Sequence, residues 1–205
     1  MQAPDRKQAI LFLSRFAIVF VGLHMPVPWL ADAYATAYDC AANYVLCPIL
    51  NQLSDVTMEF EPPETIAALG HWEGNLRIQS NVTGQVARTN LNIRTFSYRP
   101  LATFFALALS APLGGFRRKA LVVGGGSFLM FGLGMFLSAL PILSRFSATG
   151  VLGVAPGLAV RTIYEAIATP VMMYAIPLIV FLALAVFSSR SSKQDPAFSQ
   201  SAPSQ

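Results

Sequence analysis

The chain has 205 residues, 54% of them hydrophobic and 12% charged, with a formal net charge of +4. Because an ordinary soluble domain is roughly a quarter charged, this composition argues against a soluble globular protein and indicates a membrane protein. The positive charge follows from where the cations lie relative to a membrane, so it gives no reason to expect a nucleic-acid surface. The partners expected first are therefore the lipid bilayer and other membrane proteins.

Four apolar stretches are long enough, or nearly so, to cross a hydrocarbon core, which requires about 20 helical residues. They run from Ile10 to Leu30, from Leu101 to Phe116, from Ala120 to Leu143 and from Val171 to Phe187. The predicted fold class is mainly α. We expect a polytopic membrane protein with about four transmembrane helices and a small α+β module outside the membrane.

The cations lie at alternate ends of these stretches. Eight of them share one side: Arg6, Lys7, Arg15, Arg117, Arg118, Lys119, Arg190 and Lys193. By the positive-inside rule, both termini and the basic turn between the second and third stretches are cytoplasmic, and residues 31–98 and 144–170 face outward. The sequence therefore predicts a multi-pass protein of the inner membrane with an extracytoplasmic domain.

Four parts follow from this topology: an anchor helix (1–30), an extracytoplasmic α+β module (31–98), a three-helix membrane region (99–189) and a cytoplasmic tail (190–205). The tail is rich in serine, glutamine and proline, which is typical of disorder. The first part also resembles a cleaved secretory signal, but Arg15 interrupts its apolar run and favours an uncleaved anchor.

The extracytoplasmic module reads as one helix followed by three strands. Apolar residues at three-to-four spacing predict an amphipathic helix that ends near Pro48; they are Tyr34, Tyr38, Ala41, Val45 and Ile49. Alternating apolar residues then predict three strands: Val56, Met58 and Phe60; Leu76 and Ile78; Thr89, Leu91 and Ile93. With a turn at Asn81 to Gly84, we expect a helix covering one face of a three-stranded antiparallel sheet.

The two cysteines, Cys40 and Cys47, both fall in this helical region. Seven residues of straight helix separate them by about 10 Å, whereas a disulfide requires Cα atoms within about 7 Å. A disulfide between them therefore requires the helix to break early, which Pro48 favours. The alternative is a pair of buried thiols, since two thiolates without nearby histidines do not complete a metal site.

Small residues recur at helical spacing in the second and third apolar stretches. In the second, the repeat is every four residues: Ala102, Ala106, Ser110 and Gly114. In the third, Gly125, Gly132 and Ala139 recur every seven residues, and Gly134 and Ser138 add a further pair. Small residues allow transmembrane helices to approach closely. We therefore expect these two helices to pack on each other, and one stripe to serve a partner subunit.

The glycine run Gly124 to Gly126 is not a phosphate-binding loop, because Lys119 precedes it and no strand leads into it. Neither His24 nor His71 belongs to a metalloprotease motif, and no nucleophile elbow is found. No catalytic residue, metal or cofactor is therefore predicted. One candidate binding site remains, at the outward rim of the helices: Arg94, Arg99, Arg161 and Glu165.

The segment from Asn92 to Arg145 consists of an apolar helix, a basic turn and a second apolar helix that leads to an outward arginine. In this arrangement it resembles the core of exosortase and archaeosortase membrane proteases. That family works with a cysteine at the start of the first helix, an Asn-x-x-Arg pattern near the end of the second, and a later histidine. Here Tyr98 and Arg99 open the first helix, Pro141 precedes Arg145, and no later histidine follows. The resemblance implies a catalytically inactive relative.

Two classes of function remain. The first is a non-catalytic integral membrane protein that acts as a structural or assembly subunit of a larger membrane complex. The second is a membrane enzyme or carrier whose site one sequence does not reveal, with an inactive exosortase-like accessory protein as a further alternative. Few charges fall within the apolar stretches and no internal repeat of the alternating-access kind is present. The subunit is therefore the favoured prediction.

Overall fold

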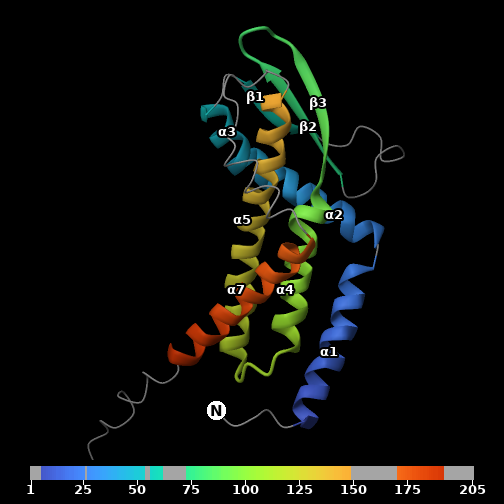
Figure 1. The fold of residues 1–205 in the computed structure, drawn as a ribbon, viewed down its shortest axis with the longest axis vertical. Helices are drawn as coiled ribbons and strands as arrows, with labels where there is room; N and C mark the ends of the chain where they lie inside the picture. The colour runs from blue at the N-terminus through green and yellow to red at the C-terminus, as the bar shows by residue number, and fades with distance from the viewer. Residues whose placement is uncertain (1–5, 26, 54–55, 62–72, 149–169, 192–205) are drawn as a thin grey trace, which may run out of the picture.

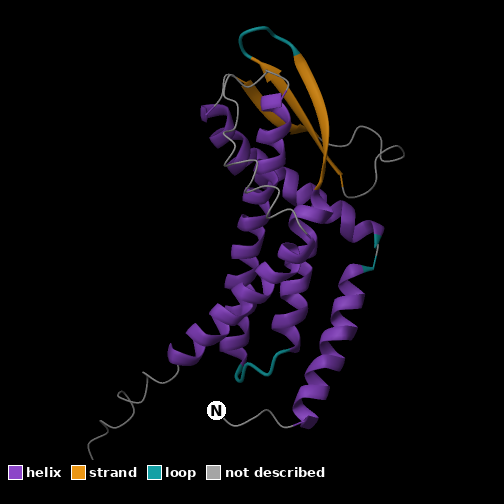
Figure 2. Ribbon diagram, in the orientation of Figure 1, coloured by secondary structure: helices purple, strands orange, loops and turns teal. Residues whose placement is uncertain are grey.

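The computed structural model describes residues 6–25, 27–53, 56–61, 73–148 and 170–191. Its helices are α1 (Arg6–His24), α2 (Pro28–Ala41), α3 (Cys47–Leu53), α4 (Arg99–Ser110), α5 (Phe116–Ala148) and α7 (Pro170–Ser191). Two single π-helical turns, η1 (Ala42–Leu46) and η2 (Arg94–Tyr98), lie within longer helical runs, and the strands are β1 (Val56–Glu61), β2 (Glu73–Ser80) and β3 (Val86–Asn92). The mainly α class with a small sheet is confirmed (Figure 2).

The helices and the sheet form two connected layers. Helices α1, α4, α5 and α7 make a bundle, and α2, η1 and α3 lie with the sheet at one end of it (Figure 1). Each layer has its own hydrophobic core. Helix α5 belongs to both, because Val122 and Met130 lie in the bundle core whereas Ala139 and Ile142 lie in the core beneath the sheet. Its 33 residues span about 50 Å.

The three strands form an antiparallel sheet in the order β1-β2-β3, as the sequence predicts. Val56, Met58 and Phe60 are buried together with Leu76 and Ile78, so the alternation of the first two strands is confirmed. The turn after β2 ends at Gly84, whose φ of 68° favours glycine. Only the end of the third strand differs, because Ile93 is buried but already begins the next helical run.

In the helix over the sheet, the residues that face the core match the prediction at first and then differ from it. Tyr34 is half-buried and Tyr38 buried, as expected, but Val45 and Ile49 are exposed. The residues that take their places are one position later: Ala42, Leu46 and Leu50. The cause is η1, because a π-turn holds one more residue than an α-turn and so displaces every later side chain around the helix.

Each π-turn stands directly before a residue followed by proline, namely Cys47-Pro48 after η1 and Arg99-Pro100 after η2. A proline inside an α-helix lacks an N–H donor, and its ring clashes with the carbonyl four residues earlier. A wider turn ahead of the proline displaces that carbonyl. The helix therefore continues through Pro48 to Leu53, and the prediction that it ends near Pro48 is wrong.

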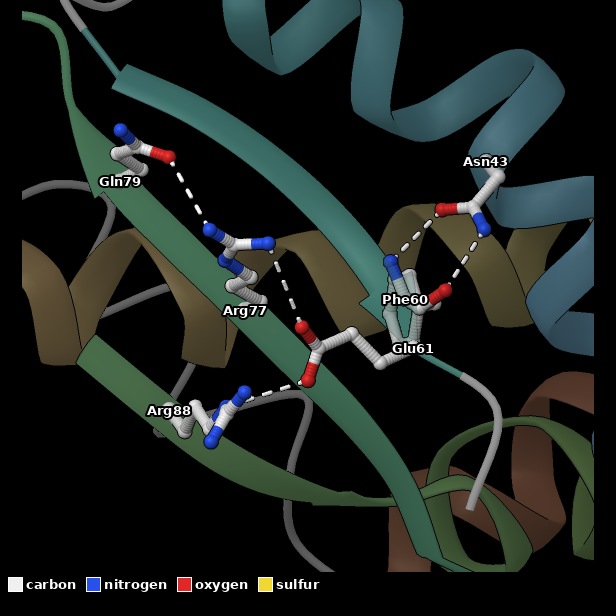
Figure 3. A network of polar contacts seen from close by, with 6 residues as sticks. All are labelled: Asn43, Phe60, Glu61, Arg77, Gln79 and Arg88. Atoms are coloured by element: carbon white, nitrogen blue, oxygen red, sulfur yellow. Dashed lines mark hydrogen bonds and ion pairs between the residues drawn. The ribbon is translucent and has the colours of Figure 1, made fainter. Parts of the chain in front are cut away.

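Two asparagines cover the outer edge of β1. The side-chain amide of Asn43 accepts from the backbone N–H of Phe60 at 2.8 Å and donates to the carbonyl of Phe60 at 2.9 Å. Asn51 accepts from the N–H of Met58 at 2.7 Å. These bonds, of which Figure 3 shows those of Asn43, occupy backbone groups that an edge strand otherwise leaves open to other chains.

The solvent side of the sheet carries an ion-pair network that crosses all three strands. The Glu61 carboxylate lies 3.2 Å from the guanidinium of Arg88 and 3.7 Å from that of Arg77. Arg77 also donates to the side chain of Gln79 at 3.3 Å (Figure 3). The polar face of the sheet thus points away from the core, which matches the period-two pattern of the sequence.

Among the described residues, two helical stretches are long and apolar enough to cross a membrane: Arg6–His24, and Phe116–Ile142 of α5. The prediction of about four such helices is therefore not met in full. Helix α4 has 12 residues and spans about 18 Å, against a hydrocarbon core of about 30 Å. In α7 the apolar stretch is Tyr174–Val186, which is also short. The first stretch ends at His24 instead of Leu30.

The turn between α4 and α5 lies earlier than predicted. Gly114 and Gly115 both have positive φ, 63° and 54°, and they reverse the chain, so Gly114 does not extend the packing face of α4. Arg118 and Lys119 belong to the first turn of α5, where cations oppose the helix dipole. Their side chains instead donate to backbone carbonyls of neighbouring helices, Arg118 to Ala185 within α7 and Lys119 to Leu109 in the last turn of α4.

Of the three α5 glycines predicted to pack against α4, Gly125, Gly132 and Gly134, only Gly134 makes a close contact. Ala102, Ala106 and Ser110 are buried on α4, and Ser138 and Ala139 are buried on α5. Gly125 and Gly132 are exposed, and a Cβ built on either would meet open space. The close contacts fall at Gly126, beneath the ring of Phe104, and at Gly134, against Ser97. A bulky residue at position 132 is therefore not expected to disturb this chain's own core.

We expect Gly134→Ala to destabilise the protein, because the new Cβ would overlap the backbone of Ser97. Overpacking of this kind costs about 1 to 3 kcal/mol. Gly132→Ala is the matched control, since the same change two residues away enters open space and alanine favours a helix. Thermal unfolding of the purified chain in mild detergent measures both. An equal loss in the two variants would contradict the assigned contact.

Candidate interaction surface and helix junction

The π-turn η2 is the point where bundle and module meet. Ser97 is fully buried against Gly134 of α5. Its hydroxyl lies 2.6 Å from the phenol oxygen of Tyr34 on α2, and the Tyr34 ring stands edge-on to Tyr98 with 5.1 Å between centroids. Three segments far apart in sequence, α2, η2 and α5, are thereby joined by side chains of one small cluster.

The same π-turn holds the end of α1. The Tyr98 hydroxyl donates to the carbonyl of Leu23 at 2.6 Å, and the Arg94 guanidinium donates to the carbonyl of His24 at 3.0 Å. The last carbonyls of a helix have no partner within it and carry a partial negative charge, so a hydroxyl and a cation are suitable donors. Helix α1, which has no fully buried residue of its own, is held at this end by these two bonds.

An aromatic ladder runs along α1 toward that junction. Phe12, Phe16, Phe20 and His24 follow one another at four-residue spacing, with ring centroids 6.3, 5.4 and 4.0 Å apart. Phe20 also lies 6.4 Å from the ring of Tyr174 on α7. The ladder marks the face of α1 that is turned to the bundle, and it ends at a histidine.

Of the predicted outward-rim site, the structure places two residues. Arg94 and Arg99 lie at the two ends of η2, and the charges of both act on the His24 ring. Arg161 and Glu165 lie outside the described residues, so the four-residue site stays a prediction. His24, which the sequence alone left aside as a site, is the residue that the structure adds to this pair.

The two cysteines are free thiols. Cys47 is buried and its thiol lies 3.5 Å from the Asn43 amide oxygen, whereas Cys40 is exposed on the other side of the helix. The disulfide considered from the sequence is not formed, because the helix does not break at Pro48. The alternative of two buried thiols is correct for Cys47 alone, and burial raises the pKa of that thiol to about 11.

A buried carboxyl lies in the core of the module. Asp39 has little exposed surface, and no hydrogen-bond partner for its Oδ1 is found within the described ranges. Gly74 makes room for it, since a Cβ there would come within 3.0 Å of Oδ1 and 2.8 Å of Ile93 Cδ1. Removal of this carboxyl from water disfavours its charged form and raises its pKa to about 7. The periodicity of the sequence does not predict an acidic residue in the core of the module.

We expect the Asp39 carboxyl to make stability depend on pH. Because its pKa is raised in the folded chain to about 7, folding is favoured while the group stays protonated, and stability falls as pH rises from about 4 to 7. Asp39→Asn removes this dependence. The melting temperature of the variant relative to that of the wild type should therefore be higher at pH 8 than at pH 5. Thermal unfolding at the two pH values measures it, with Glu59→Gln controlling for the loss of one charge. An unchanged difference would contradict burial of the carboxyl.

The outer side of the helical run α2–η1–α3 is an exposed surface without charge. Tyr44 is 81% exposed, Val45 50% and Ile49 52%. Around them lie further exposed small or uncharged residues: Ala33, Thr36, Ala37, Cys40, Pro48 and Gln52. Residues 28–53 contain no lysine or arginine, and their acids are Asp32 and the buried Asp39. We call this surface the α2–α3 face. The sequence alone shows that residues 28–53 lack cations, and this signal could have predicted the α2–α3 face.

No catalytic or metal-binding arrangement is found among the described residues, where no three potential ligands of one metal ion come together. The segment that resembles the exosortase core forms η2, α4, the glycine turn and most of α5. Tyr98, at the start of this segment's first helix, donates to the carbonyl of Leu23 and so holds α1.

No protein-family model matches the chain, and neither the search of curated proteins nor that of solved structures returned a match. Among the described residues, the α2–α3 face and the Arg99 guanidinium have no contact assigned to them above.

Proposed function

We propose that this protein is a non-catalytic integral membrane protein that acts as an assembly subunit of a larger membrane complex. The observation that carries the proposal is the α2–α3 face, an exposed and uncharged surface on the module outside the candidate spans. The partner is a second, different membrane protein that presents an apolar or aromatic surface of its own.

Membrane insertion is supported by the exposed apolar side chains of the two candidate spans. On α1, Ile10, Leu13 and Ile18 are between 56% and 74% exposed, and on α5 Phe128 is 79% exposed. In water such surfaces are a liability, whereas lipid covers them without cost. Helices α4 and α7 would complete a four-span bundle, since α4 continues from η2 as one helical run beside α1, α5 and α7.

The α2–α3 face lies on the module at the end of the bundle (Figure 1), so we assign it to a protein partner and not to the hydrocarbon of the bilayer. The centres of protein interfaces are depleted in charge and enriched in aromatic residues, and this face carries the exposed Tyr44 and no lysine or arginine. Large exposed apolar patches on water-facing surfaces mark sites of association. The outward glycines of α5, Gly125 and Gly132, offer a second contact of the same kind to a helix of the partner within the bilayer.

The proposed orientation places both termini in the cytoplasm and the module outside. Val82, on the turn between β2 and β3 and outside the α2–α3 face, is 78% exposed, so Val82→Cys in a Cys40→Ser background should be labelled by a membrane-impermeant maleimide added to sealed cells. Arg117 is exposed at the opposite end of the bundle, so Arg117→Cys in a Cys40→Ser background should be labelled only after permeabilisation. Labelling of position 117 in sealed cells would overturn the orientation.

The proposed docking is tested by a photoreactive phenylalanine analogue placed at Tyr44. In intact cells it should give one discrete adduct with another membrane protein, identified by mass spectrometry. The same analogue at Glu59, which is exposed on β1 away from this face, is the control and should give none. Tyr44→Glu should then abolish copurification of that protein in mild detergent, because it buries an unpaired charge in the interface.

Two results would contradict the proposal. The first is an adduct formed by Tyr44 only with lipid or with a second copy of this chain. The second is an assembly of unchanged size and composition after Tyr44→Glu. Glu59→Ala provides the matched variant, since it changes one exposed side chain of the module without touching the α2–α3 face.

A further inference from the structure

The π-turn η2 brings two arginines to one end of the bundle. The backbone N–H of Arg99 donates to the carbonyl of Arg94, which is the i→i+5 bond that defines a π-turn. Residues five apart lie on different sides of an α-helix, but a π-turn places them one above the other. Both charges consequently act on the ring of His24, at the end of α1.

The two arginines differ in what they contact. Arg94 donates to the His24 carbonyl and thereby closes the end of α1. Arg99 is half-buried, and its guanidinium has no hydrogen bond or ion pair with any residue in the described ranges, although it lies close enough for its charge to act on the His24 ring. A partly desolvated guanidinium with its donors unused is a ready site for an oxyanion.

The His24 ring has one nitrogen in a hydrogen bond and one without a partner among the described residues. Its Nδ1 lies 2.9 Å from the carbonyl of Phe20, and the ring stacks on Phe20 with 4.0 Å between centroids. Because a carbonyl accepts, Nδ1 carries the hydrogen, and in the neutral ring Nε2 presents a lone pair. This Nε2 is shielded from bulk solvent and has no partner within the part of the chain that the structure describes.

We propose that Arg99 and His24 form a binding site for a phosphomonoester group. Arg99 donates to two oxygens of the phosphate, as the fork of a guanidinium does with such groups. A monoester or free phosphate near neutral pH retains one hydroxyl proton part of the time, and this O–H donates to Nε2 of His24. A phosphodiester or sulfate has no such proton at that pH, so the pair discriminates among anions of similar shape.

The same chemistry has two sources, the headgroup of phosphatidic acid or phosphate in solution. A lipid source follows from the proposed position of His24 and Arg99 at the outer end of the spans, where arginine side chains reach headgroups. Binding itself does not depend on the proposed partner protein, so failure of the docking experiment would leave this site untouched, and failure of this site would leave the docking proposal untouched.

The test uses the purified full-length chain in neutral detergent, with retention of added lipid measured by native mass spectrometry. Phosphatidic acid should be retained more strongly than phosphatidylglycerol of the same acyl chains. Arg99→Gln should weaken retention of phosphatidic acid by about tenfold, the size expected for losing a charge-assisted hydrogen bond. His24→Phe keeps a stacking ring on Phe20 but removes Nε2, and it should abolish the preference over phosphatidylglycerol. Arg117→Gln, at the other end of the bundle, is the control and should change neither.

Inorganic phosphate and sulfate distinguish the two sources. If phosphate displaces phosphatidic acid whereas equal sulfate does not, the site recognises the phosphate group itself and also accepts it from solution. If phosphate has no effect while the lipid preference persists, the lipid is the ligand. Equal retention of the two lipids by the wild type, or an unchanged preference in both Arg99→Gln and His24→Phe, would overturn the proposal. Thermal unfolding of each variant is measured as a control to confirm that it is folded.

Discussion

The contact between Ser97 and Gly134 is the constraint on which the rest of the arrangement depends. Because Gly134 has no side chain, the backbone of η2 reaches the surface of α5. Once η2 is there, Tyr98 and Arg94 meet the end of α1, and Ser97 meets Tyr34 of α2. One missing side chain thus determines where the bundle, the first helix and the module come together.

Proline imposes the second constraint. Pro48 and Pro100 would each interrupt a helix, and in both places the chain forms a π-turn just ahead of them and continues. In η1 the additional residue rotates Leu46 and Leu50 into the core and leaves Val45 and Ile49 outside. In η2 it aligns Arg94 with Arg99. The exposed face and the arginine pair are therefore consequences of accommodating a proline without ending the helix.

The sequence predicts those parts of the fold in which the type of each side chain, apolar or polar, indicates directly whether it is buried. In β1, Val56, Met58 and Phe60 alternate with polar residues, and they are buried as the pattern requires. Two features depend instead on geometry that no single residue reveals. A π-turn rotates the residues that follow it around the helix axis, so each buried residue after Tyr38 lies one position later in the sequence than predicted. Which glycine touches a neighbour depends on the rotation of α5 about its axis, so Gly134 could not be separated from Gly132 by spacing.

Helix α5 is shared by both hydrophobic cores, and this has a thermodynamic consequence. Val122 is buried in the bundle and Ile142 beneath the sheet, within one uninterrupted helix. Neither layer can lose its packing without exposing part of the helix that the other layer requires, so the two are coupled as one cooperative unit. Any molecule that binds only the folded module then stabilises the bundle as well, by an amount set by its concentration and affinity. Binding at one end of this protein therefore changes the stability of the other end.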